Sequence, residues 1–300
     1  MSIDIKIVGA GRRGEWHVHG DQAGAENARL MEGGVEGIYD APTQTIWTRA
    51  RRERGGRFKG MEQPERDVLL ALGVQARSHE EWLEDDSSMR EAFTYHLDPW
   101  DKDDELAQIV VDVEEERRLR MQLAQEPEFN PNVLKHSTLN SVVKYRLKVA
   151  QPMWEAKTVV ASWETAGSSG SGFITVSNPT GVEMFQTWVL TPGTWTLSDF
   201  SWQGPRRKRT PADNRTITLN PVTTTHGGLT IRLDPMRRMF THLDGSNAAA
   251  QVAGGYWFTQ TIPPFTPKTD LPISVTDAPA GGARAELHQP RLYSRPWGDV

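Results

Sequence analysis

Short runs in which apolar and polar residues alternate, each closed by a turn signal, constrain the fold of the second half of this chain. Residues 173–176 end at the turn signal of residues 178–181, and residues 188–190 end at Thr191-Pro192-Gly193. Most of the 19 prolines lie in this half, where they suit strand edges and loops. Short strands separated by frequent turns predict a β-sandwich or jelly roll. The other expected strands cover 195–197, 217–219, 229–233, 256–258, 271–275 and 283–287.

The first half mixes strands with one helix. Ser78 and Glu81 have the S-x-x-E spacing of a capping box, which predicts a helix that begins after Ser78. The stretch VVDVEEERRLRMQLAQ is rich in helix formers, but its apolar and polar residues alternate on both sides of residues 115–117. We therefore favour a β-hairpin over a helix at this point. A further strand is expected over residues 143–149.

The motif G-x-G-x-x-G at residues 9–14 follows an apolar run and matches a dinucleotide-binding fingerprint. Such a site needs a helix directly after the glycines, because the helix N-terminus binds the pyrophosphate. Residues 15–19 instead alternate as a strand does, and Gly20 and Gly24 would interrupt a helix. We predict a β-hairpin that pairs residues 3–8 with residues 15–19, and no cofactor.

Charge is divided unevenly along the chain. Residues 1–155 carry a net charge of −8 (21 basic, 29 acidic), whereas residues 156–300 carry +3 (13 basic, 10 acidic). This change near QPMW at 151–154 predicts two domains, residues 1–152 and residues 153–300. The acidic balance argues against a general nucleic-acid-binding protein, which needs a broad basic face.

The residues that could carry chemistry are scattered. His17 and His19 would share one face of a strand and could begin a metal site, but no ligand cluster accompanies them, so we interpret them as surface residues. The carboxylate runs 84–86 and 101–105 lack the apolar pocket that a glycosidase acid needs. Cysteine is absent, and no apolar run is long enough to cross a bilayer. We therefore predict no catalytic, cofactor-binding or metal-binding residue, no enzyme and no membrane insertion.

Two features of the second domain suit partner contacts. Arg206, Arg207, Lys208 and Arg209 form a basic run beside Trp202, which fits either a solvated loop or a contact with phosphate or an acidic partner. We name these five residues as candidate partner contacts. The second domain also holds several tryptophans, which pack in cores more commonly than they stack on sugars.

Several stretches resemble the distal tail proteins of long-tailed phages, with the greatest likeness to minor tail proteins of phages that infect mycobacteria. In the first domain and at its end these are DAPTQTIWTRARRERGGRFKGMEQPERDVLLAL (40–72), SMREAFTYHLDPWD (88–101) and QPMWE (151–155). In the second domain they are GSGFITVSNPT (170–180), TPGTWTLSDFSW (191–202), GGLTIRLDPMRRM (227–239) and VTDAPAGGARAELHQPRLYSRPWG (275–298). The resemblance covers most of the chain and is weakest over residues 1–35.

The resemblance implies a mainly β protein in which an N-terminal β-sandwich with a helix and a β-hairpin precedes a galectin-like or carbohydrate-binding-module-like β-sandwich. It implies a structural virion protein at the distal end of the tail, where six copies form a ring around the DNA channel. The implied partners are other copies of the chain, the tail-tube protein, the tail-tip hub and other minor tail proteins, with DNA only in transit.

A negative channel wall would repel passing DNA at a range of about 8 Å. We therefore expect some acidic residues to face the channel or a junction between rings, namely Asp101, Asp103, Asp104, Glu105, Glu114, Glu115 and Glu116. The alternative function is a carbohydrate-binding, host-receptor-binding tail component that uses the C-terminal sandwich. Whether residues 291–300 pack on their own domain or return to the first stays open at this point.

Overall fold

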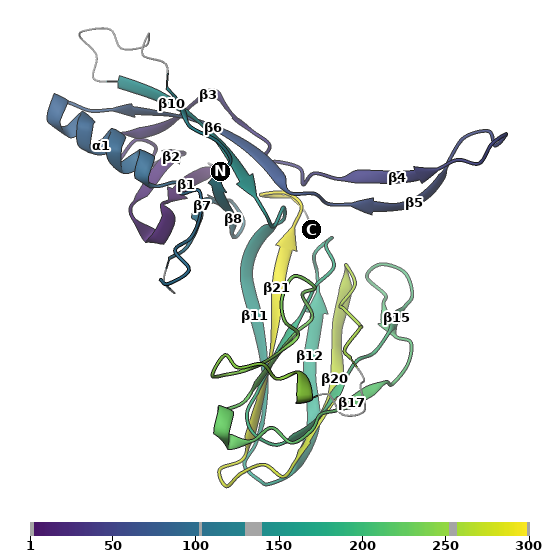
Figure 1. Ribbon diagram of the computed structural model, residues 1–300. Coiled ribbons are helices and arrows are strands. Elements are labelled where there is room, and N and C mark those ends of the chain that lie inside the picture. The colour runs from purple at the N-terminus through teal and green to yellow at the C-terminus, as the bar shows by residue number, and fades with distance from the viewer. Residues whose placement is uncertain (1–2, 102–103, 130–139, 252–256, 299–300) are drawn as a thin grey trace. The chain divides into compact units, whose positions relative to one another are not determined.

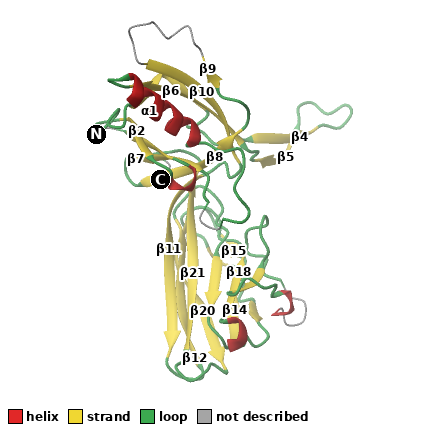
Figure 2. Ribbon diagram, turned by 60° about the vertical axis from the view of Figure 1, so that its left-hand side comes forward, coloured by secondary structure: helices red, strands yellow, loops and turns green. Residues whose placement is uncertain are grey.

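The computed structural model describes residues 3–101, 104–129, 140–251 and 257–298. The chain divides into two compact units, one formed by Met1–Ala156 with Tyr293–Asp299 and the other by Lys157–Leu292. Antiparallel strands dominate both units (Figures 1 and 2). The expected mainly β fold is therefore confirmed. Among the described residues, no helix has the length and apolar character needed to cross a membrane.

One sheet of the first unit contains both predicted hairpins. Strand β1 (Asp4–Val8) pairs with β2 (Glu15–His19) on one side and with β7 (Ala107–Asp112) on the other, and β7 pairs with β8 (Glu116–Leu123). The stretch rich in helix formers is thus a hairpin, because alternation on β8 buries Arg117, Leu119, Met121 and Leu123 while the residues between them face outward. Periodicity outweighs helix propensity here.

The second sheet of the first unit follows the order β3 (Ala28–Glu36), β6 (Arg66–Gln75), β10 (Asn140–Val149). Strand β9 (Glu128–Phe129) and the end of β8 also pair with β10, so the two sheets are joined at this edge. The core lies between the sheets and contains Ile7, Ile109 and Leu119 from one and Leu70, Leu72 and Tyr145 from the other.

The helix of the first unit begins where the capping box predicts. Helix α1 (His79–Glu91) has Ser78 as its N-cap, and the Ser78 side chain accepts a hydrogen bond from the backbone N–H of Glu81 at 3.2 Å. Met89 packs into the core from one face of the helix, and Trp82 packs against it. Strands β4 (Gln44–Thr48) and β5 (Arg57–Glu62) form a separate two-stranded ribbon that extends away from the sheets (Figure 1).

The second unit is a β-sandwich. Its two sheets bury a shared core that includes Trp188, Trp195, Leu229 and Ile273. The first sheet contains β12 (Gly170–Asn178), β20 (Thr266–Thr276), β14 (Thr194–Ser198) and β17 (Thr216–Thr218), in that order. The second contains β19 (Phe240–His242), β18 (Leu229–Arg232), β13 (Thr187–Leu190), β21 (Ala283–Tyr293) and β11 (Trp154–Thr165), in that order. Strands β15 (Trp202–Gln203) and β16 (Thr210–Pro211) form a small hairpin.

The C-terminal segment belongs to the first unit. The ring of Tyr293 lies under the Arg117 guanidinium, with 3.5 Å between the guanidinium carbon and the ring centroid. Arg117 also donates a hydrogen bond to the backbone oxygen of Arg295 at 3.0 Å, and Trp297 packs against the first core. The domain boundary expected from the sequence, between residues 152 and 153, would assign residues 293–298 to the second domain. The structure groups them with the first unit.

Candidate assembly and ligand surfaces

The glycine motif forms the turn between β1 and β2, as the alternation predicts. Its backbone N–H groups are already used, since Ala10 donates to the oxygen of Ala92 at 2.8 Å and Gly11 donates to the oxygen of Glu105 at 2.8 Å. Gly9 donates to the oxygen of Gly14, the residue that closes the turn. A nucleotide phosphate needs free N–H groups at a helix N-terminus. This turn therefore lacks the donors of a dinucleotide site.

The seven candidate acids do not form one patch. Asp101, Asp104 and Glu105 precede β7, whereas Glu114, Glu115 and Glu116 follow it, and Asp103 lies outside the described residues. A strand of six residues is about 20 Å long, so the two groups lie at opposite ends of β7. The first group borders the glycine turn, where Glu105 is 3.8 Å from Arg12. The second borders the start of β1, because Asp4 pairs with Asp112.

His17 and His19 share the outward face of β2, but each is engaged by the protein. His17 Nδ1 lies 3.0 Å from Glu26 Oε1, and His19 Nδ1 lies 2.9 Å from the oxygen of Ile3. Partial burial raises the pKa of Glu26, but hydrogen bonds from His17 outweigh it, so the net shift is downward. Within the described ranges, no three His, Asp or Glu side chains are placed to hold a metal ion.

The basic run lies at the turn of the β15–β16 hairpin. Arg206, Arg207 and Lys208 are exposed, and the guanidinium carbons of both arginines lie over the Phe265 ring at 5.5 and 5.6 Å. Arg209 is half-buried, and the Trp202 indole packs against the core of the second unit. Three of the five named residues are thus exposed, and the Trp202 side chain points inward.

The ribbon formed by β4 and β5 is a feature that our sequence analysis did not identify. We call residues 44–62 the arm. Within the part of the chain that the structure describes, its two strands pair only with each other, and Trp47 packs edge-on against Phe58 with ring centroids 5.6 Å apart. These two side chains nevertheless remain 58% and 56% exposed. The signal for it in the sequence was the basic, glycine-containing turn RARRERGGR at residues 49–57.

A second exposed surface of the first unit is acidic. We call residues 79–101, which comprise α1 and the loop after it, the acidic segment. Eight of its residues are acidic and only Arg90 is basic. The outward face of α1 carries Glu80, Glu84 and Glu91, and Leu83 is exposed beside them. In the following loop, Trp100 is 91% exposed.

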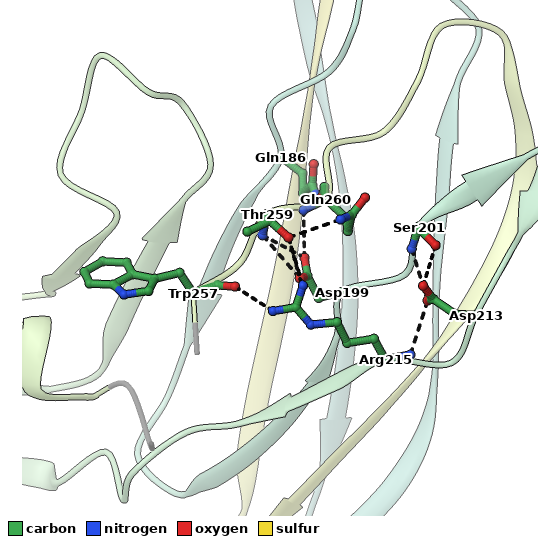
Figure 3. Close-up of polar contacts among 8 residues, drawn as sticks. All are labelled: Gln186, Asp199, Ser201, Asp213, Arg215, Trp257, Thr259 and Gln260. Atoms are coloured by element: carbon green, nitrogen blue, oxygen red, sulfur yellow. Dashed lines mark hydrogen bonds and ion pairs between the residues drawn. The ribbon is translucent and has the colours of Figure 1, made fainter. Parts of the chain in front are cut away.

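A buried carboxylate organises one loop of the second unit (Figure 3). Asp199 accepts hydrogen bonds from the backbone N–H groups of Thr259 and Gln260, and it lies 3.0 Å from Arg215 Nη1. Arg215 in turn donates to the backbone oxygen of Trp257 at 3.0 Å. The Asp199 carboxylate therefore holds the loop of residues 257–260 in place through these contacts.

This network explains one wrong expectation and one exposed aromatic residue. The alternation at 256–258 predicts a strand, but Trp257 and Phe258 are irregular, and Tyr256 lies outside the described residues. Just after them, the backbone N–H groups of Thr259 and Gln260 donate to the Asp199 side chain and not to a neighbouring strand. The backbone oxygen of Trp257 faces Arg215, whereas its indole points away from this network and remains 48% exposed (Figure 3).

Comparison with known proteins gives matches in structure and none in sequence. No protein-family model matches the chain, and no curated protein matches it. The crystal structure of the Dit protein of phage SPP1, described as a paradigm of the hub adsorption apparatus in phages that infect Gram-positive bacteria, matches with a TM-score of 0.56 and 10% identity. That match covers 97% of this chain and 100% of the Dit chain.

The phage P2 baseplate in its activated conformation also contains a matching chain. The structures with Ca and with Sr each match with a TM-score of 0.51 and 10% identity, over 97% of this chain and 98% of the other. At this identity the matches establish a shared fold. They extend over both units, so the order of the two units along the chain is shared as well as each sandwich.

Proposed function

We propose that this chain is a structural protein of the distal tail of a long-tailed phage, a distal tail protein in the sense of the Dit protein of SPP1. The observation that carries the proposal is the end-to-end match to that protein, which spans both units. The sequence stretches that resemble distal tail proteins support it independently, because the resemblance rests on residues and the match rests on coordinates. The relation to phages that infect mycobacteria is part of the proposal.

In this proposal the first unit forms a ring, with six copies around the DNA channel, and the second is a galectin-like sandwich at the periphery. The ring joins the tail tube to the tail-tip hub and its adhesion proteins. Closure of a ring requires two different patches on each subunit. The arm and the acidic segment are two such candidate patches on the first unit, and both expose apolar side chains.

The placement of the acids refines the channel hypothesis. Since the groups before and after β7 lie at opposite ends of the strand, they cannot line one small patch. We propose that one group faces the channel and the other faces a neighbouring ring or tail protein. Reversal of each group separately, by Glu114, Glu115 and Glu116 to Lys or by Asp104 and Glu105 to Lys, would show which one affects DNA passage.

The decisive experiment is native mass spectrometry of the full-length protein combined with negative-stain electron microscopy. A closed ring with a central hole is the expected result, either for the protein alone or after addition of its tail-tip partners. A protein that stays monomeric alone and with partners, and that is absent from purified virions by mass spectrometry, would refute the proposal. We propose no catalytic role.

A second candidate function is carbohydrate binding by the second unit, as part of receptor recognition. The half-exposed indole of Trp257 favours it, because exposed aromatic faces suit sugar rings. A glycan array should then detect binding that Trp257→Ala removes and that Phe173→Ala, a change at another exposed aromatic residue of this unit, leaves intact. An array without specific signals would dismiss this candidate.

A further inference from the structure

Among the described residues, no other part of the first unit covers the exposed apolar side chains of the arm. An isolated two-stranded hairpin is marginally stable in water, and large exposed apolar patches mark interaction sites. Here both strands have unpaired outer edges, and Trp47, Phe58 and Met61 are all more than half exposed. A partner that packs on the arm would bury these side chains and stabilise the hairpin.

The charge of the arm identifies the chemistry of that partner. Within residues 44–62 there are six basic and two acidic side chains, in a domain whose total charge is strongly negative. At the turn, Glu53 forms an ion pair with Arg57 and accepts a hydrogen bond from the N–H of Ala50. The other basic side chains, including Arg51, Arg52 and Arg54, are exposed around it. The partner surface must therefore combine apolar groups with negative charge.

The same chain presents a surface of this kind. On α1, positions 80, 84 and 91 recur at helical spacing, so their three carboxylates form one outward stripe with Leu83. Tyr95, Leu97 and Trp100 in the following loop add exposed apolar area, and Asp98 and Asp101 add charge. The acidic segment thus has the apolar and electrostatic properties that complement the arm.

We propose that the arm of one copy docks on the acidic segment of a second copy of this chain. This inference rests on the proposed ring, for which it names the contact between subunits. The contact joins two different patches, so each copy uses its arm on one neighbour and offers its acidic segment to the other. A DNA duplex would match the arginines, but its bases are already stacked on one another and would leave Trp47 and Phe58 exposed, which favours a protein surface.

Engineered cysteines test this contact directly, because the natural chain has none. Arg52→Cys and Glu84→Cys are made as separate full-length variants, mixed and treated with a short bifunctional maleimide. The expected product is a cross-linked heterodimer, and the double variant should give a ladder that ends at the size of the ring. Arg206→Cys, at an exposed arginine of the second unit, replaces Arg52→Cys as the matched control and should give no ladder.

Charge reversal supplies a second test. Arg51, Arg52 and Arg54 are changed together to Glu, and Glu80, Glu84 and Glu91 are changed together to Lys. Each triple variant should require a protein concentration roughly tenfold or more higher for half-assembly. A mixture of the two should recover assembly, because in a ring of alternating variants every arm meets a segment of opposite charge. Reversal of Arg206, Arg207 and Lys208 is the charge-matched control and should change assembly little. Unchanged thermal unfolding would show that each variant is folded.

The outcomes separate this inference from the proposed function. Rings that form in both triple variants as readily as in the natural protein overturn the arm contact and leave the tail-ring proposal intact. Rings that assemble from the Arg52→Cys and Glu84→Cys variants without a cross-link between positions 52 and 84 would also overturn the arm contact. A natural protein that is absent from virions and never assembles overturns both. The arm could instead bind DNA. If the arginine triple variant loses DNA binding but still assembles, the inference is rejected.

Discussion

Replacement of Arg66 by Met should destabilise the first unit more than any surface substitution. Arg66 is only 1% exposed, and its guanidinium donates four hydrogen bonds to backbone oxygens. Nε donates to Pro152 at 2.8 Å, Nη1 donates to Gly37 at 3.1 Å and to Ile38 at 2.7 Å, and Nη2 donates to Ser294 at 3.1 Å. One side chain therefore connects the end of β3, the segment before β11 and the C-terminal segment.

The magnitude follows from these contacts. A hydrogen bond to a charged group contributes about 1.5 to 3 kcal/mol, so four would contribute about 6 to 12 kcal/mol if they were additive. Burial of the charge costs several kcal/mol and offsets part of this contribution. The same burial lowers the pKa of Arg66 to about 10. We expect a net loss of about 3 to 5 kcal/mol in the free energy of unfolding of the first unit.

The assay is urea denaturation followed by tryptophan fluorescence, with hydrogen exchange and mass spectrometry to assign the effect. Arg66→Met should speed exchange at residues 293–298 and leave the second unit unchanged. Arg66→Lys should lose most of the same stability, because one ammonium group cannot reach oxygens in three directions. Arg146→Met, which removes an exposed ion pair with Glu128, is the control and should cost less than about 1 kcal/mol. A loss below about 1 kcal/mol for Arg66→Met would refute this reasoning.

Three further predictions concern other parts of the chain. Gly14→Ala should cost about 1 to 3 kcal/mol, because Gly14 has a φ of +98° and an added Cβ would lie 2.5 Å from the Trp16 ring; thermal unfolding measures this. Asp199→Asn should cost about 2 to 4 kcal/mol and should shift the fluorescence of Trp257, whereas an unchanged spectrum would contradict the role of the network. Hydrogen bonds from Ser246 and His226 hold the pKa of Asp244 well below its usual value of 3.8 in the folded protein. Its contribution to stability is therefore present above about pH 4 and is lost as the pH falls further, so circular dichroism between pH 5 and pH 2 should show a shallower acid loss for Asp244→Asn.

The strands, hairpins and helix start were predictable because their signals are local. Alternation over residues 109–123 identified the β7–β8 hairpin against strong helix propensity, since a strand with one buried face imposes a period of two. The S-x-x-E spacing identified the start of α1, because the cap is made within four residues. The interruption by Gly20 and Gly24 was sufficient to reject the nucleotide fingerprint.

The candidate surfaces were less predictable, because they depend on what each residue contacts across the fold. The acids around β7 appear as two neighbouring runs in the sequence, but the strand between them separates the runs by its whole length. Trp202 adjoins the exposed basic run in the sequence, but its indole packs against the core of the second unit. The arm was missed because a short hairpin without a buried face has little periodicity to detect.

The sequence by itself determined the mainly β character, the position of the helix and the change of composition between the two halves. Only the tertiary structure decided that the C-terminal segment joins the first unit, where Arg66 and Arg117 bind its backbone oxygens. It also decided that Trp257 lies in a loop fixed by Asp199. The physical reason is range: periodicity and capping act over a few residues, whereas buried arginines and carboxylates find partners that can lie more than 200 residues away.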